Sequence, residues 1–119
     1  MAVKITDIKN EAQALHERHE SETGRRTAAS KHYYYAFHLC KSIWPSLSKP
    51  GNYGMHKAFC NGLKESEQLR KIGGNLDKLR SLRVDADYYI QKDFYKMQLD
   101  RAKELVDSIE KEIIRILHP

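Results

Sequence analysis

The sequence has no long apolar run and few cysteines, and each shortage excludes a class of protein. A helix that crosses a bilayer needs about 18 consecutive apolar residues, and no stretch of the chain approaches this, so we expect no membrane span. The first residues, MAVKITDIKNEAQ, contain no apolar segment of the kind that a secretory signal peptide carries. We therefore expect the protein in the cytoplasm, with no membrane partner.

Cys40 and Cys60 are the two cysteines of the chain. In a cytoplasmic protein, two thiols are expected to stay reduced and to be half-buried packing residues. No CxxC or HExxH motif occurs, and the six histidines do not show the spacing of a zinc site with the cysteines. The sequence therefore predicts no metal site and no cofactor.

Positive charge is concentrated in the middle of the chain, whose formal net charge is +5. Residues 21–50 hold five basic side chains against one acidic, and residues 51–92 hold eight against five, whereas the two ends are nearly balanced. A basic centre suits a polyanionic partner such as RNA or a nucleotide. A solvated basic surface without a partner would have the same composition, so charge alone does not decide between them.

Apolar residues recur at helical spacing in four segments and nowhere alternate as in a strand. These segments are residues 4–20, 27–44, 54–83 and 94–117, the third broken by the glycine pair at 73 and 74. Gly24 is expected to end the first helix, and Pro45 the second, before a loop at 45–52. The 119 residues suit one domain. We predict a single all-α domain over residues 1–119, a four- or five-helix up-and-down bundle.

The second predicted helix contains RRTAASKHYYYAFHLC, residues 25–40, and is apolar or aromatic around most of its circumference. Its expected core face contains Ala29, Tyr33, Ala36, Phe37, Cys40, Ile43 and Trp44. Tyr34 and His38 form a neighbouring strip, and His32 beside Lys31 is expected to be exposed. A helix of this kind is buried on more than one side, so we expect a homodimer interface or a cleft beside it.

Two motifs, in this order, resemble the HEPN superfamily, in particular its small prokaryotic branch. SKHYYYAFH, which begins at Ser30, is similar to S-R-x-Y-Y-x-x-F-H, and LRVDADY, which begins at Leu82, is similar to L-R-x-x-A-D-Y before the final helix. The resemblance runs from about Arg25 to the C-terminus. It implies a compact helical bundle that pairs through its long helices.

The resemblance leaves two functions open. Many HEPN proteins are metal-independent endoribonucleases of toxin–antitoxin, CRISPR-linked or antiviral defence systems, and others are non-catalytic partners of small nucleotidyltransferases. Active members carry an arginine, four to six residues and then a histidine at the start of a late helix, and two such motifs meet across the dimer. Here Arg83 is followed after four residues by Tyr88. The missing histidine favours the non-catalytic module, whereas the basic centre and the histidines of the second helix favour an RNA-binding protein or ribonuclease.

The candidate catalytic residues each have a structural alternative. Arg83 is a phosphate ligand, since a guanidinium matches phosphate oxygens, or it forms a half-buried ion pair with Asp87, four residues on. Tyr88 is suited to donate a hydrogen bond or to position a phosphate, because its ordinary pKa near 10 makes it a poor general base. The arginine–histidine spacing recurs at Arg26 and His32, a second candidate pair of cation and base for RNA cleavage.

The candidate RNA-binding residues are Lys31, Tyr34, His38 and Asp87. Tyr34 and His38 are four residues apart, so their side chains would together offer a surface on which a nucleotide base stacks. Alternatively, they fill the core or lie in a dimer interface. His38 is also an alternative to His32 as the base. His56 receives no role at this stage.

Overall fold

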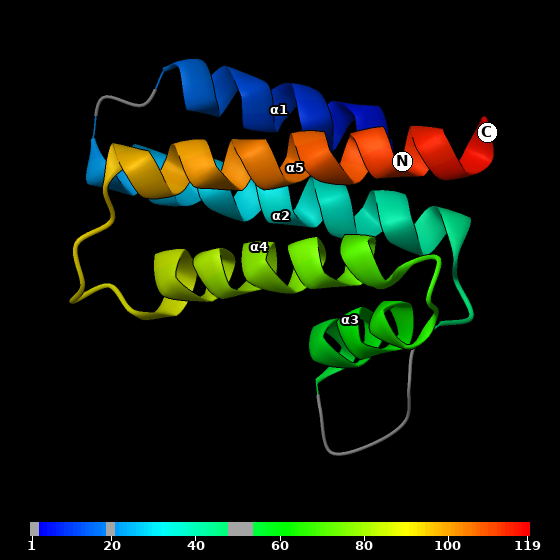
Figure 1. Ribbon diagram of the computed structural model, residues 1–119. Coiled ribbons are helices and arrows are strands. Elements are labelled where there is room, and N and C mark those ends of the chain that lie inside the picture. Colours follow the sequence, from blue (N-terminus) through cyan, green and yellow to red (C-terminus); the bar gives the residue numbers. More distant parts are fainter. Residues whose placement is uncertain (1–2, 19–20, 48–53) are drawn as a thin grey trace.

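The structure, a computed structural model, describes residues 3–18, 21–47 and 54–119. These residues form five helices and no strand, which confirms the predicted all-α fold (Figure 1). The helices are α1 (Ile5–Glu17), α2 (Glu22–Ile43), α3 (Met55–Glu65), α4 (Arg70–Tyr88) and α5 (Lys96–Leu117). The chain runs in alternating directions through α1, α2, α4 and α5, and the shorter α3 packs against α4 on the side away from α1 (Figure 1).

The central element of the bundle is α2, which packs against α1, α4 and α5. Its fully buried side chains include Ala28, Ala29, Tyr33, Phe37 and Cys40. This arrangement explains why α2 is apolar around most of its circumference without a second protomer. The homodimer stays a prediction. The apolar circumference of α2 no longer supports it, because other helices of the same chain cover this helix.

The connection between α1 and α2 differs from the sequence-based expectation. Gly24 does not end the first helix, because it lies in the first turn of α2, where its N–H donates to the Ser21 side chain at 3.0 Å. Ser21 is thus the N-cap, and α2 begins at Glu22 rather than at residue 27. Residues 19–20, at the predicted end of the first helix, lie outside the described residues, as do residues 48–52 of the predicted loop.

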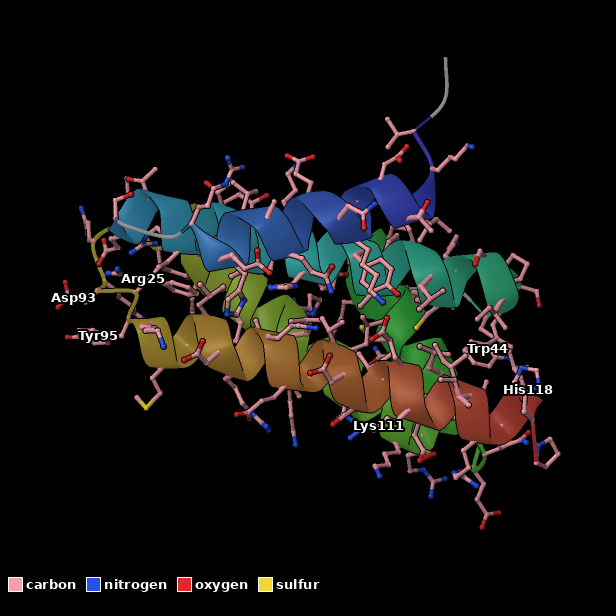
Figure 2. All side chains as sticks on the ribbon, turned by 90° about the horizontal axis from the view of Figure 1, so that it is seen from above. Arg25, Trp44, Asp93, Tyr95, Lys111 and His118 are labelled. Atoms are coloured by element: carbon pink, nitrogen blue, oxygen red, sulfur yellow. The ribbon has the colours of Figure 1, made fainter. Side chains whose placement is uncertain are left out.

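The first turn of α2 also holds the chain between α4 and α5. The carboxylate of Glu22 accepts a hydrogen bond from the backbone N–H of Phe94 at 2.9 Å, and Arg25 Nε donates to the Phe94 carbonyl at 3.0 Å. Figure 2 shows Arg25 at this end of the bundle together with Asp93 and Tyr95, opposite Trp44 and His118. Because Phe94 is fully buried, the connection is fixed by both packing and polar contacts.

The break in the third predicted segment is not at the glycine pair. The chain leaves the helical path between Glu65 and Arg70, and both glycines lie inside α4. A Cβ on Gly73 would lie 2.8 Å from the Cβ of Leu63 and from the backbone nitrogen of Lys64. Gly73 therefore permits close packing of α3 on α4 and does not end a helix.

The two glycines of α4 give a matched test of this packing. Gly73→Ala is expected to lower the free energy of unfolding by about 1–3 kcal/mol, because the added methyl group would collide with α3. Gly74→Ala has nothing within 4 Å of the added carbon. It is expected to raise the same free energy by about 0.5–1 kcal/mol, since alanine is the better helix former. Urea denaturation of both variants measures the difference, and effects of the same sign would contradict the packing.

Candidate functional site

Two strips of polar side chains face each other where α2 packs against α4. Tyr34 lies on α2, and Arg83 and Asp87 lie one turn apart on α4. Arg83 Nη2 donates a hydrogen bond to the Tyr34 hydroxyl, and Ser30 Oγ donates to Asp87 Oδ2 at 3.1 Å. We call the group formed by Tyr34, Arg83, Asp87 and Tyr88 the Arg83 site.

The guanidinium of Arg83 is held between aromatic rings. Its central carbon lies 5.0 Å from the ring centroid of Tyr34, 5.3 Å from that of Tyr88 and 5.9 Å from that of Tyr33. Arg83 Nε is 2.9 Å from Asp87 Oδ2, with side chains 13% and 29% exposed, which confirms the predicted half-buried ion pair. Since Nε makes no hydrogen bond within the described residues, this contact is one of charge.

His56, at the beginning of α3, lies beside this group, although the sequence analysis assigns it no role. Its Nδ1 lies 2.7 Å from the hydroxyl oxygen of Tyr33, and its ring centroid lies 4.3 Å from that of Phe37 and 5.9 Å from that of Tyr34. Burial lowers the pKa of His56, and the charges of Arg83, His38 and Arg80 lower it further. The imidazole is therefore neutral at pH 7 and lies next to a cation.

Tyr88 is an exposed member of the Arg83 site, and the exposed His38 lies beside the site on α2. The ring of His38 stacks on that of Tyr34 with centroids 6.4 Å apart, and His38 is exposed to solvent. Tyr88 is 65% exposed although its ring contacts the guanidinium of Arg83. Lys31, also a predicted ligand, is half-buried on α2.

A surface pocket of about 420 Å³ opens beside Asp87, between the beginning of α2 and the end of α4. Its lining residues are Glu22, Thr23, Arg26, Thr27, Ala86, Asp87 and Ile90. Asp87 thus belongs both to this pocket and to the Arg83 site. A ligand at Arg83 would therefore have an open, partly polar cavity next to it.

His32 is not exposed as the sequence analysis expected. Only 2% of its surface is accessible, because α1 and α5 cover its side of α2. His32 Nε2 lies 2.9 Å from His16 Nδ1 on α1, and His16 Nε2 lies 3.1 Å from Asp100 Oδ1 on α5. Burial, followed by the neighbouring charges of His16 and Lys103, lowers the pKa of His32 to about 4. The ring has a defined place in the interior, away from Arg83.

Arg26 is a residue of α2 whose guanidinium binds the C-terminal end of α4. Its Nη1 donates to the carbonyls of Asp85 and Ala86, both at 3.0 Å, and its Nη2 donates to the carbonyl of Lys92. A cation at a helix C-terminus satisfies carbonyls that have no partner within the helix. The structure therefore does not bring Arg26 and His32 into one site, because the two contact different helices.

No three side chains of the kinds that ligate metals come together in the part of the chain that the structure describes. Nor does any helix of these residues combine the length and the apolar character that crossing a bilayer requires. Comparisons of the chain with protein-family models, curated proteins and solved structures find no match in any of the three. The HEPN resemblance therefore stays a prediction that rests on the two motifs.

The burial of His32 predicts a stability that depends on pH. Its pKa falls from 6.5 to about 4 on folding, so the unfolded chain binds the proton more readily. The free energy of unfolding is therefore highest above pH 6.5, where His32 is neutral in both states. It decreases as the pH falls toward 4, because the unfolded chain takes up a proton that the folded chain does not. The free energy of unfolding should decrease by up to about 3 kcal/mol over this range.

Urea denaturation at pH 7 and at pH 5 measures about 2 kcal/mol of this decrease. The matched variant His32→Gln lacks the titrating group and should lose most of the slope in this window, whatever its stability at pH 7. A slope that is unchanged in the variant would show that other groups cause it.

Proposed function

We propose that the chain is a HEPN-type RNA-binding protein whose Arg83 site holds a phosphate of the RNA backbone. The observation that carries the proposal is that Tyr34 and Asp87 hold the guanidinium of Arg83 in place. Two exposed side chains, Tyr88 and His38, lie beside it. An arginine held in place by its neighbours loses little side-chain entropy when it binds an anion. The guanidinium of Arg83 is thus already oriented to bind an anion.

The surroundings of Arg83 also suit the base of a nucleotide. Tyr88 presents an exposed ring beside the guanidinium, and His38 stacks on Tyr34 at the other edge. Single-stranded nucleic acids bind through phosphate contacts combined with stacking of bases on aromatic side chains. The pocket beside Asp87 gives space for the adjoining nucleotide.

The proposal extends to metal-independent cleavage of the bound RNA. When His56 Nδ1–H donates to the Tyr33 hydroxyl, Nε2 keeps a lone pair that can accept the proton of a ribose 2′-hydroxyl. The 2′-oxygen then forms a bond to phosphorus, the bond to the 5′-oxygen breaks, and His38 supplies a proton to that oxygen. Arg83 stabilises the negative charge on the phosphoryl oxygens. The products are a 2′,3′-cyclic phosphate and a 5′-hydroxyl, and the setting implied by the resemblance is a toxin–antitoxin or antiviral defence system.

A second candidate is the non-catalytic HEPN module that pairs with a small nucleotidyltransferase. It is favoured by exposed apolar side chains in the chain from the end of α4 to the beginning of α5. These are Tyr88, Tyr89, Ile90, Tyr95 and Met97. Exposed apolar groups of this kind mark protein interfaces, and Tyr88 occupies the position where the active members have the histidine.

Replacement of Arg83 tests the binding proposal. Arg83→Ala should weaken binding of a labelled single-stranded RNA by roughly 10–100-fold, because a charged hydrogen-bonding group is lost. It should also lower the slope of log affinity against log salt by about 0.7. Gel-shift titration at several salt concentrations measures both quantities.

Arg101→Ala is the matched control for this experiment. Arg101 also pairs with a carboxylate one turn along its helix, Glu104 at 3.4 Å, but it lies on α5 and is 51% exposed. The two variants should therefore differ in RNA affinity at equal net charge. Equal affinities, or no binding by the wild type at low salt, would end the binding proposal.

Cleavage is tested by replacement of His56. His56→Asn should reduce the cleavage rate by about 10²–10⁴-fold, because the general base is lost, while RNA affinity stays near that of the wild type. EDTA should have no effect on the wild-type rate, and His32→Gln should cleave normally in a folded protein at pH 7. Wild-type protein that binds RNA without cutting it would support the non-catalytic candidate.

A further inference from the structure

A second basic group lies between α3 and α4, outside the Arg83 site. Asp77 Oδ2 accepts hydrogen bonds from Lys57 Nζ at 2.8 Å and from Lys64 Nζ at 2.6 Å, and Asp77 Oδ1 accepts one from Arg80 Nε at 3.0 Å. We call these four residues the Asp77 cluster. Burial alone would raise the pKa of Asp77, but the three hydrogen bonds hold it well below its usual range. The carboxylate is therefore ionised, and three positive charges surround one negative charge.

The excess of two positive charges is not required to pair Asp77. One cation would neutralise the carboxylate, and the two ammonium groups bound to the same oxygen lie close enough to repel each other. The side chains of Lys57 and Lys64 are 33% and 35% exposed, whereas Asp77 is 17% exposed. The two ammonium groups are thus more accessible to solvent than the carboxylate that they share. A second anion at this position would relieve the repulsion.

The Asp77 cluster continues directly into the Arg83 site. Asp77, Arg80, Arg83 and Asp87 follow one another at three- or four-residue intervals and so share one face of α4. Arg80 and Arg83 are separated by about 4.5 Å along the helix axis. On α3, Lys57 of the cluster directly follows His56, and the charges of both Arg80 and Arg83 act on His56. The two groups form one basic strip.

We propose that the Asp77 cluster is a second phosphate subsite, with Lys57 and Lys64 as its phosphate ligands. The inference rests on the proposed function of the Arg83 site and narrows it. The ligand of this face is an RNA strand with several phosphates and not a mononucleotide. Asp77 competes with the phosphate for these cations.

The double variant Lys57→Gln/Lys64→Gln tests the subsite, since Arg80 remains to pair Asp77. Fluorescence anisotropy with a labelled single-stranded RNA over a range of salt concentrations is the measurement. The variant should lower the slope of log affinity against log salt by about 1.4, because two phosphate contacts are lost from a single strand. Binding of AMP, which carries one phosphate group, should change much less.

The control variant Lys4→Gln/Lys96→Gln removes the same charge from exposed lysines of other parts of the bundle. If the cluster variant loses no more affinity than this control while Arg83→Ala still weakens RNA binding, the subsite is refuted and the proposed function stands. If the wild type binds no RNA at low salt, both fail together. Circular dichroism confirms that each variant is folded.

Asp77→Asn supplies an independent result of opposite sign. Loss of the competing carboxylate should strengthen RNA binding and steepen its salt dependence, even though the variant is expected to be less stable than the wild type. Weaker RNA binding by a folded Asp77→Asn protein would overturn the role given to the carboxylate.

Discussion

Four consecutive side chains of α2 fix the arrangement of the other helices. His32 contacts His16 of α1, and Tyr33 contacts His56 of α3. Tyr34 accepts from Arg83 of α4, and Tyr35 donates to Glu110 of α5 at 2.5 Å. Successive residues of a helix point about 100° apart, so each polar tip reaches a different neighbour. A buried polar group without a partner costs about 1–3 kcal/mol, and these four contacts therefore select one arrangement of the bundle.

This constraint explains why the sequence predicted the helices better than their ends. Apolar periodicity indicates that a segment is a helix with a buried face, and each of the five helices in the described residues overlaps a segment predicted in this way. A glycine, however, serves equally well at a helix end and at a close approach between helices. The sequence predicts a break at both Gly24 and Gly73, but Gly24 lies in the first turn of α2, after the N-cap Ser21, and Gly73 packs against Leu63. For Gly73 the answer depends on a residue of another helix, Leu63.

The candidate site shows the same division between local and distant information. The pair of Arg83 and Asp87 follows from the four-residue spacing of one helix and could be predicted. His56 could not, because it is placed beside Arg83 only by the packing of α3. Likewise, His32 was expected to be exposed because the periodicity of α2 does not tell which of its sides other helices cover. The one local signal for His56 was a histidine in the first turn of a helix, a position that by itself implies no site.

The distribution of charge separates the roles of the two basic groups. Arg83 is matched by one carboxylate, Asp87, so the Arg83 site carries little excess charge and acts through the direction of its guanidinium. The Asp77 cluster carries two excess positive charges on flexible lysine stems, which attract a polyanion but do not orient it. On this basis the cluster would supply most of the salt-dependent affinity, and Arg83 would determine which phosphate lies beside His56. In the proposed function, an RNA strand attracted by the Asp77 cluster and oriented by Arg83 would have its reacting bond placed by the fold, because Tyr34 connects Arg83 to the central helix of the bundle.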